Sequence, residues 1–432
     1  MLVTLFIFFA SKLDVKEFKL DNGLQVLIYE DHSAPVVSTQ IWYRVGAYNE
    51  PKGFTGISHL LEHMGFKGTK KVPVKEYSKI IERNGGDENA FTSRHYTCYF
   101  ANLARDRYHI ELELEADRIQ NLLLDSLEYS REKEVVKEER RLGENDPFDA
   151  LWEEFFAVAY KVHPYKNPVI GWMDDIERIT FKDLREYYHT YYNPANALIM
   201  IAGDVQPEAA LKLVKKYFGR IRGRPVKEIV YNEPEQKGER RFKIKREVET
   251  PALMIGYHIP NINHPDAYTL DVISYILGRG KSSRLYKRMI YDERLALSIS
   301  CSSWADKYPG IFYFYVIPQF GKEIAQMEKV IYEEIDRLKR EPVGDDELER
   351  VKNQVLADFV LAKDGVMRMG YEIASAEIIT GDYRYIETYP DRIAHISKDD
   401  IMNTAQKYLN EDNRTVGILV PIPKDIFDQE AR

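Results

Sequence analysis

One order of elements occurs twice in this chain, and that repeat restricts the fold more than any other feature. Strand-like and helix-like segments follow one another as strand, helix, strand pair, several helices and a final strand, and the same order returns about 210 residues later. Strands and helices grouped in this way are typical of α+β domains. The sequence therefore predicts two homologous α+β domains, each a mainly antiparallel sheet with helices packed on one face.

A segment rich in charge and proline separates the two copies. Residues 223–240 contain Pro225 and Pro234 and show little apolar periodicity, which is typical of a linker. We therefore expect an N-terminal domain at 13–222 and a C-terminal domain of the same fold at 241–432.

The chain begins with an apolar run. Residues 2–10 read LVTLFIFFA, far short of the ~20 residues that span a bilayer. No basic segment precedes the run, and no clear small-residue cleavage site follows it. Two interpretations of residues 1–12 stay open. A signal or anchor remnant predicts a periplasmic or membrane-associated protein, whereas a strand or disordered tail predicts a cytoplasmic one.

Composition and motifs argue against several kinds of partner. The 61 basic and 69 acidic residues give a net charge of −8 without a basic block, so we expect no nucleic-acid partner. Cys98 and Cys301 are too few for a disulfide framework or a cysteine zinc site. Gly280-Lys281-Ser282 lacks the glycine that a phosphate loop needs five residues earlier, where Tyr275 stands, so we expect no nucleotide.

The opening helix of the first copy carries His59-Leu60-Leu61-Glu62-His63. On an α-helix His59 and His63 lie about 40° apart and one turn apart, so both imidazoles can reach one metal ion. Glu62 lies about 60° to the other side of His59, close enough to touch a water on that metal. The pattern matches the inverted zincin motif, and zinc activates water for hydrolysis. The alternative is a chance arrangement of polar residues on a helix surface.

A later helix, SREKEVVKEERR, offers a third ligand. Glu132 and Glu139 are seven residues apart and lie within about 20° on the helix wheel, with Val135 and Val136 on the same side, which we expect to be buried. A buried carboxylate is costly unless it is paired or binds a metal. This singles out Glu139 as a ligand and Glu132 as its supporting partner. The alternative, a solvated helix with charged pairs, accounts for the glutamates on the opposite side, Glu134 and Glu138.

With these residues in place, the chain resembles the pitrilysin/insulinase family of zinc peptidases. It looks closest to mitochondrial processing peptidase and its bacterial relatives. The motif His59-x-x-Glu62-His63, followed 76 residues later by Glu139 (139 − 63 = 76), is similar to the pattern of this family. The resemblance covers nearly the whole chain and includes NGLQVLI, GISHLLEHMGFKGT, Asn89-Ala90-Phe91-Thr92-Ser93, EKEVVKEE, PVIGW and YYNPANALIMIAGD.

The resemblance implies a zinc-dependent endopeptidase that cleaves extended peptides. It makes His59, His63 and Glu139 the ligands of one zinc ion per chain, Glu62 the general base and Glu132 a supporting residue of the site.

The resemblance also places Asn89, Ala90 and Phe91 near the metal as substrate-binding residues. An exposed strand there would bind a peptide by adding it to the sheet edge. The alternative for Asn89 is a turn residue after Gly86.

The second copy departs from the family pattern. Its counterpart helix, YTLDVISYILGRG, has neither His nor Glu, so we expect one zinc site per chain. Self-sufficient members carry an Arg and, seven residues later, a Tyr; here Ile290 and Leu297 stand at those positions. The resemblance then implies a heterodimer whose homologous partner subunit supplies the Arg/Tyr pair. If the alignment is shifted and Arg288, Arg294 or Tyr291 fills the role, a self-sufficient homodimer or monomer is expected instead.

Two other classes compete with these. A non-catalytic scaffold subunit resembles the family but typically loses the metal ligands, which are intact here. A zinc hydrolase acting on something other than peptides satisfies the short motif but not the resemblance along the chain.

Overall fold

In the computed structural model, which describes residues 13–422, the chain divides into two units that are not continuous in sequence. Within the described range, unit 1 comprises residues 13–140, 167–230 and 362–388, and unit 2 comprises residues 141–166, 231–361 and 389–422. The apolar run at 2–10, on which the expectations for localisation rest, lies outside the described residues. No helix between residues 13 and 422 is both long and apolar enough to cross a bilayer.

Unit 1 contains a six-stranded sheet in the order β1-β2-β6-β3-β5-β4. β2 and β6 are parallel, and all other neighbours are antiparallel. A hairpin at its edge joins β1 to β2 through Gly23, whose φ of +89° suits glycine. The strands are β1 (Val15–Lys19), β2 (Gln25–Glu30), β3 (Val36–Tyr43), β4 (Asp87–Thr92), β5 (Thr97–Ala104) and β6 (Ala197–Gly203).

Unit 2 repeats this topology with one strand fewer. Its order is β7-β11-β8-β10-β9, with β7 and β11 parallel and the other neighbours antiparallel. Position by position this is the order β2-β6-β3-β5-β4, so the predicted fold class of two homologous, mainly antiparallel α+β units is confirmed. The strands are β7 (Arg240–Arg246), β8 (Ala252–Ile259), β9 (Ala296–Trp304), β10 (Gly310–Pro318) and β11 (Arg414–Pro421).

The helices follow the same duplication. Those of the first copy are α1 (Ile57–Met64), α2 (Glu76–Arg83), α3 (His109–Asn121), α4 (Ser126–Asn145), α5 (Pro147–Ala159), α6 (Met173–Arg178), α7 (Phe181–Tyr191) and α8 (Pro207–Phe218). Those of the second are α9 (Pro265–Leu277), α10 (Arg284–Tyr286), α11 (Ile324–Arg340), α12 (Asp345–Leu361), α13 (Val366–Thr380), α14 (Tyr385–Ala394) and α15 (Lys398–Tyr408). Short helical turns lie at Ala47–Asn49, Pro164–Lys166, Pro194–Asn196 and Glu411–Asn413, and a π-helix at Lys287–Asp292.

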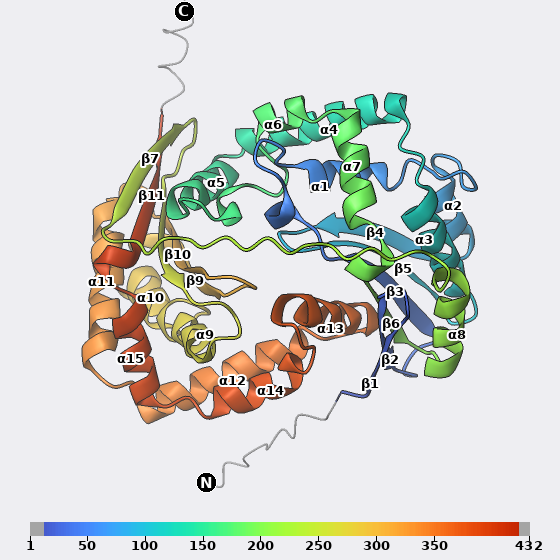
Figure 1. Ribbon diagram of the computed structural model, residues 1–432. Helices are drawn as coiled ribbons and strands as arrows, with labels where there is room; N and C mark the ends of the chain where they lie inside the picture. The colour runs from blue at the N-terminus through green and yellow to red at the C-terminus, as the bar shows by residue number, and fades with distance from the viewer. Residues whose placement is uncertain (1–12, 423–432) are drawn as a thin grey trace, which may run out of the picture. The chain divides into compact units, whose positions relative to one another are not determined.

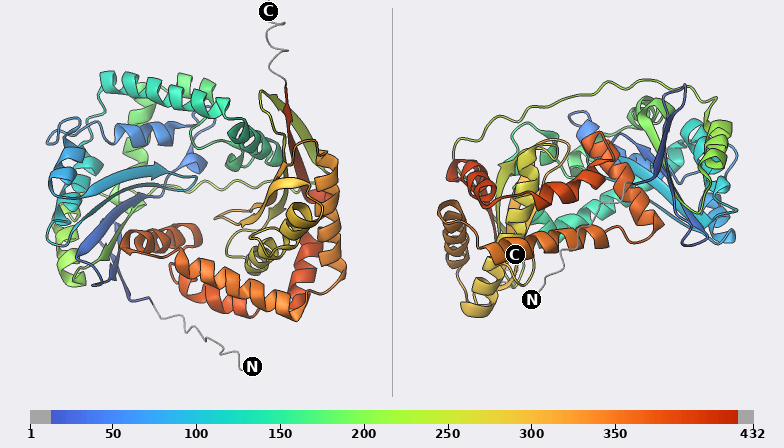
Figure 2. Two further views of the ribbon diagram at one scale, coloured as in Figure 1. Left: turned by 180° about the vertical axis from the view of Figure 1, so that it is seen from behind. Right: turned by 90° about the horizontal axis from the view of Figure 1, so that it is seen from below.

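The equivalent helices α5 and α13 are exchanged between the two units (Figures 1 and 2). In unit 2, Trp152 of α5 packs edge-on against Tyr313 of β10 at 4.8 Å between ring centroids. In unit 1, the carbonyl oxygen of Met367 in α13 accepts a 3.0 Å hydrogen bond from Gln40 of β3. Each unit thus includes one segment from the other predicted range, 13–222 or 241–432, and each sheet gains a helix on its second face.

Strand β7 begins where the predicted linker ends, and charged residues outnumber apolar ones in its sequence, RRFKIKR. It is an edge strand, with Phe242 and Ile244 half-buried and Lys243 and Lys245 exposed. Charged residues are common on edge strands because they oppose pairing with another chain. The strand pairs in parallel with β11, a neighbour that lies far away in sequence.

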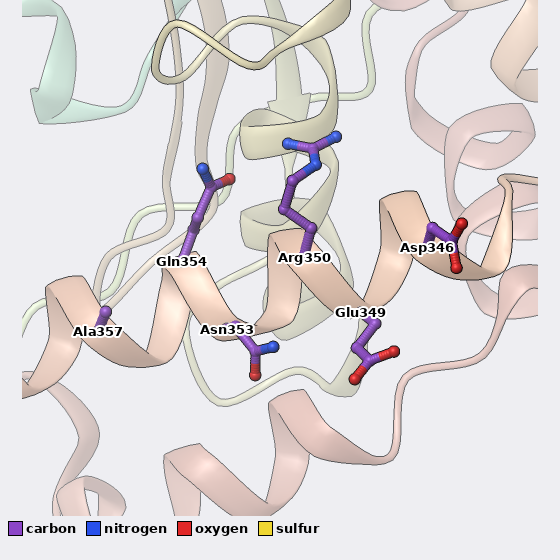
Figure 3. Close-up of a pocket in the computed structure, with 6 residues that line it drawn as sticks. All are labelled: Asp346, Glu349, Arg350, Asn353, Gln354 and Ala357. Atoms are coloured by element: carbon purple, nitrogen blue, oxygen red, sulfur yellow. The ribbon is translucent and has the colours of Figure 1, made fainter. Parts of the chain in front are cut away.

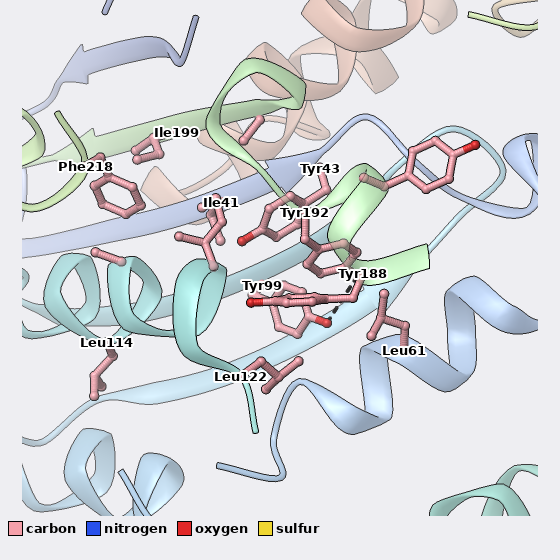
Figure 4. Close-up of a cluster of buried hydrophobic side chains, with 14 of the residues drawn as sticks. Ile41, Tyr43, Leu61, Tyr99, Leu114, Leu122, Tyr188, Tyr192, Ile199 and Phe218 are labelled. Atoms are coloured by element: carbon pink, nitrogen blue, oxygen red, sulfur yellow. Dashed lines mark hydrogen bonds between the residues drawn. The ribbon is translucent and has the colours of Figure 1, made fainter. Parts of the chain in front are cut away.

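The core of unit 1 is rich in tyrosine (Figure 4). The rings of Tyr43 and Tyr192 stack at 4.1 Å between centroids, and Tyr99 meets Tyr43 edge-on at 6.1 Å. All three are buried. Gly65, at the end of α1, makes room for Tyr99, because a Cβ at this glycine would come within 2.6 Å of the Tyr99 hydroxyl. The end of α1 is therefore fitted closely to the sheet.

We predict that Gly370→Leu destabilises the protein whereas Gly143→Leu does not. Both glycines lie inside helices. A Cβ at Gly370 of α13 would approach Nε2 of Gln40 to 2.8 Å, whereas a Cβ at Gly143 of α4 meets nothing within 4 Å. Overpacking typically costs about 1–3 kcal/mol, while replacing a helical glycine gains up to about 1 kcal/mol. Thermal unfolding should show a midpoint several degrees lower for Gly370→Leu than for Gly143→Leu. Equal midpoints would contradict the packing of α13 on this sheet.

Candidate metal centre

Helix α1 begins at a buried carboxylate. Glu50 accepts hydrogen bonds from the backbone N–H groups of Gly56 (2.8 Å) and Ser58 (2.9 Å), groups that have no partner within the helix. Burial raises the pKa of Glu50 to about 8, although these two hydrogen bonds oppose the shift. Gly56 has a φ of +89°, and a Cβ there would come within 2.3 Å of the carbonyl oxygen of Ile170. The start of the helix is thus fixed on two sides.

Three side chains converge on one point beside α1. Nε2 of His59 lies 3.9 Å and Nε2 of His63 lies 3.5 Å from Oε2 of Glu139 on α4. The three candidate ligand atoms all lie within 4.8 Å of one another. Zinc binds imidazole nitrogen and carboxylate oxygen at about 2.0–2.2 Å, so two atoms that bind the same ion lie up to about 4 Å apart. The separations between the three side chains are close to this range. The donor set therefore fits zinc.

The protonation of His59 suits a metal ligand. Burial, with a smaller effect of the neighbouring His63, lowers the pKa of His59 to about 4. The imidazole is therefore neutral near pH 7, the form that binds metals. The two imidazole rings pack edge-on, with their centroids 4.7 Å apart.

Glu132 supports His63 from the other side of the ring. Its Oε2 lies 3.3 Å from Nδ1 of His63, and its Oε1 lies 2.6 Å from Nζ of Lys67. A metal-binding histidine commonly donates its second N–H to a carboxylate, which fixes the ring. Glu132 lies two helical turns before Glu139 on α4. The side chain of Glu132 is 12% exposed, whereas that of Glu139 is 40% exposed. Lys67 balances the charge of the more buried carboxylate.

The helix wheel of α4 places the glutamates as predicted but not one of the valines. Val136 is fully buried, whereas Val135 is 44% exposed, so the expectation that both are buried is wrong for Val135. The buried stripe of α4 is narrow and runs through Tyr129, Val136 and Arg140. At 100° per residue, Glu132 and Glu139 lie at the margin of this stripe and Val135 lies beyond them.

The Glu62 carboxylate faces the edge strand of the sheet. Its Oε2 accepts a 2.5 Å hydrogen bond from the hydroxyl of Thr92, the last residue of β4. Burial raises the pKa of Glu62, and the hydrogen bond from Thr92 partly offsets this. Tyr99 of β5 reaches the backbone carbonyl of Glu62, with its hydroxyl 3.4 Å from that oxygen. Glu62 is thus held between α1 and the β4–β5 hairpin.

The predicted substrate-binding residues lie on β4, at the outer edge of the sheet. Asn89 is exposed, and its side-chain oxygen accepts a 2.8 Å hydrogen bond from the backbone N–H of Ala90. Ala90 is half-buried against the core on the side of α1. Phe91 points to the opposite face, where it packs edge-on against Trp42 at 5.6 Å and contacts Tyr371 of α13 at 5.7 Å. The structure does not bring the Phe91 side chain to the metal cluster.

Sequence reasoning missed three residues of this centre. Thr92 could have been found by the period of two along β4, since it falls on the same face as Ala90. Lys67 lies four residues after His63 but beyond the end of α1, so helical spacing alone does not place it. Nothing in the local pattern identifies Glu50 as the residue that caps α1.

A separate cavity lies in unit 2, along α12 (Figure 3). It has a volume of about 470 Å³ and is open to solvent. Arg350 and Gln354 from its wall donate hydrogen bonds of 2.6 and 3.0 Å to the hydroxyl of Ser282. Ser282 belongs to the Gly280-Lys281-Ser282 segment, so its side chain is already engaged within the unit. The residues that line the cavity are Asp346, Glu349, Arg350, Asn353, Gln354 and Ala357.

Two family models match successive parts of the chain. One, described as insulinase (peptidase family M16), covers residues 25–172, which include the three convergent side chains and Glu62. The other, described as peptidase M16 inactive domain, covers residues 178–355. Together they span most of the chain.

Individual relatives agree with these matches. The chain is 31% identical to the zinc protease PqqE of Helicobacter pylori over 408 residues, 93% of this chain and 92% of that protein. It is 28% identical to an uncharacterized zinc protease, YmxG, of Bacillus subtilis over 400 residues, 92% and 96% of the two chains.

Solved structures resemble the fold equally well. A crystal structure of a protease from Helicobacter pylori superposes with a TM-score of 0.89 at 31% identity, covering 94% of this chain and 99% of that one. A peptidase M16 inactive domain from Pseudomonas fluorescens, at 18% identity, shares the fold with a TM-score of 0.86 over 95% and 98% of the chains. The chain described here therefore belongs to the insulinase family of peptidases, M16, and is a zinc metalloprotease.

Proposed function

We propose that this chain is the zinc-bearing subunit of a processing-peptidase-like endopeptidase, with zinc held by His59, His63 and Glu139. The observation that carries the proposal is the convergence of these three side chains within 4.8 Å, beside the half-buried Glu62. A non-catalytic scaffold has no need of such a cluster. The proposal also explains why two glutamates, Glu132 and Glu139, lie at the margin of the buried face of α4.

In this proposal the residues of the chain divide the work of hydrolysis. Bound zinc supplies a Lewis acid that polarises a peptide carbonyl and lowers the pKa of water. Glu62 takes the proton of the attacking water and returns it to the leaving amine, as a general base and then a general acid. Glu132 orients His63 through the second ring nitrogen.

The edge strand β4 is the proposed site of the peptide. It forms one end of the sheet in unit 1, and so one side of its backbone has no neighbouring strand among the described residues. An extended peptide can pair with such an edge through main-chain hydrogen bonds, which read backbone more than side chain. Asn89 and Ala90 then contact the peptide, whereas the Phe91 side chain acts by packing the strand onto α13.

We propose a partner subunit because Ile290 and Leu297 stand where self-sufficient members carry Arg and Tyr. Ile290 is half-buried and Leu297 is 62% exposed on β9, and neither side chain can donate a hydrogen bond. Arg288 is engaged by the carboxylates of Glu293, Glu333 and Glu334, which makes it a poor substitute for a substrate-binding arginine. A homologous chain that carries Arg and Tyr would supply the missing donors.

A self-sufficient homodimer or monomer is the competing proposal. Two observations favour it: Tyr291 is 58% exposed, and Arg294 is exposed and has a φ of +49°. Left-handed backbone at a residue other than glycine often marks a functional site.

The metal assignment predicts about one zinc ion per chain. We expect His59→Ala and Glu139→Gln to lose most of the zinc after dialysis, because each removes one of three ligands. Glu138→Gln is the matched control on the same helix, because its side chain is exposed and lies about 100° around the helix from that of Glu139. Zinc is measured by atomic emission on folded protein. Full retention in either ligand variant, or loss in the control, would refute the assignment.

The general-base role predicts that Glu62→Gln keeps zinc and fold but loses most peptidase activity. The amide has nearly the same shape as the carboxylate but cannot take a proton from water. Loss of a general base typically costs ~10²–10⁴-fold in rate. Cleavage of an unstructured fluorogenic peptide is measured alongside zinc content. A zinc-loaded Glu62→Gln protein with normal turnover would exclude Glu62 as the base.

The subunit proposal predicts a large rise in activity when the chain is mixed with an Arg/Tyr-bearing homologue. Removing one donor that stabilises the transition state costs ~2.7–4 kcal/mol, or about 10²–10³-fold. We therefore expect the purified chain alone to show residual cleavage and the mixture to be at least about a hundredfold faster. Equal activity before and after mixing would favour the self-sufficient enzyme.

A further inference from the structure

We propose that Thr92 is the positioning residue for Glu62, an inference that rests on the function proposed above. Its hydroxyl donates a 2.5 Å hydrogen bond to Oε2 of the Glu62 carboxylate. This length is at the short end of the range for O–H···O hydrogen bonds, as expected when the acceptor is charged. Because Oε2 is held in this way, Oε1 is left to accept the proton of the attacking water.

The hydroxyl hydrogen of Thr92 has two acceptors within reach. Oγ1 of Thr97 on β5 lies 3.3 Å from Oγ1 of Thr92, whereas Oε2 of Glu62 lies 2.5 Å from it. The hydrogen of Thr97 goes to the carbonyl oxygen of Val45, 3.0 Å away, so Thr97 does not donate to Thr92. The shorter distance and the charge of a carboxylate acceptor direct the Thr92 hydrogen to Glu62.

The pleat of β4 determines that Thr92 faces α1. Side chains alternate between the two faces of a strand. Glu88 accepts a 2.7 Å hydrogen bond from Ser78 of α2, Ala90 packs into the core on that side, and Thr92 bonds Glu62 of α1. Phe91 points the opposite way, to α13. A shift of β4 by one residue would turn the Thr92 hydroxyl away from the base.

The same hairpin contacts Glu62 at a second atom. Thr92 pairs with Thr97, and Ala90 pairs with Tyr99 in the register of β4 and β5. Tyr99 then reaches the backbone carbonyl of Glu62 with its hydroxyl. The hairpin therefore sets both the side chain and the backbone of Glu62, while its outer edge is the strand that we propose pairs with the peptide.

This geometry has a consequence for the rate. A glutamate has three side-chain torsions, and without Thr92 its carboxylate would sample several rotamers. A displacement of ~1 Å at a catalytic group can cost about a hundredfold in rate. We therefore expect Thr92→Val, which has the same shape but no hydroxyl, to lower kcat about tenfold to a hundredfold and to leave KM unchanged.

The test compares Thr92→Val with Thr92→Ser, each made alone and together with Glu62→Gln. The chain is assayed with its Arg/Tyr-bearing homologue on an unstructured fluorogenic peptide, and zinc content and thermal midpoint are measured for every variant. We expect Ser to restore most of kcat because it keeps the hydroxyl. We also expect Thr92→Val to cause no further loss in the Glu62→Gln background, since Thr92 acts through Glu62. If Thr92→Val fails to fold, Thr92→Ala replaces it.

The outcomes separate this inference from the proposed function. Wild-type kcat in Thr92→Val overturns the positioning role, and so does an equal loss in the wild-type and Glu62→Gln backgrounds, which would indicate a merely structural residue. If Glu62→Gln itself keeps full activity, the proposed base has failed rather than its positioning. A loss of kcat rescued by Ser and absent in the Glu62→Gln background supports the inference.

Discussion

The centre depends on the docking of one short helix. α1 has eight residues, and helices of that length are not stable alone in water, so the one-turn spacing of His59 and His63 exists only because the protein holds the helix at both ends. Buried Glu50 receives the N–H groups at its start, and Tyr99 packs against Gly65 at its end. Geometry at the metal is therefore a product of packing around α1 rather than of helix propensity.

The two carboxylates that face α1 differ in burial and in their partners. The more buried carboxylate, Glu132, is paired with Lys67 and directed at His63, while the more exposed Glu139 faces both imidazoles. A buried carboxylate without a partner would be costly. Lys67 pairs with Glu132, which is the less exposed of the two carboxylates. In the proposed assignment, Glu139 is the carboxylate left to bind zinc between α1 and α4. The lower pKa of His59, which comes from burial, keeps its ring neutral and able to bind a metal.

Much of this could be predicted from the sequence, because the decisive signals are local periodicities. The helical spacing of His59 and His63 and the seven-residue spacing of Glu132 and Glu139 depend only on 3.6 residues per turn, and the structure places these four side chains together. Val135 was misplaced because periodicity gives the direction of a buried face but not its width. The exchange of α5 and α13, and the pairing of charge-rich β7 with β11, are set by contacts between distant segments. The capping role of Glu50 likewise depends on tertiary contact.

The duplication also shows why, among the described residues, such a cluster lies in unit 1 and not in unit 2. Counted from the first residue of each helix, Asp358 is the fourteenth residue of α12 just as Glu139 is the fourteenth residue of α4. In unit 2, Asp358 accepts a 2.7 Å hydrogen bond from the hydroxyl of Tyr275 near the end of α9 and lies 3.7 Å from a guanidinium nitrogen of Arg279. Most positions of α9 are buried and apolar, so in unit 2 a phenol near the end of this helix and the guanidinium of Arg279 just after it engage the carboxylate. In unit 1 the carboxylate of Glu139 instead faces the imidazoles of His59 and His63 on α1. The same backbone arrangement thus carries either a structural contact or, in the proposed assignment, a metal centre, depending on the side chains that one helix presents.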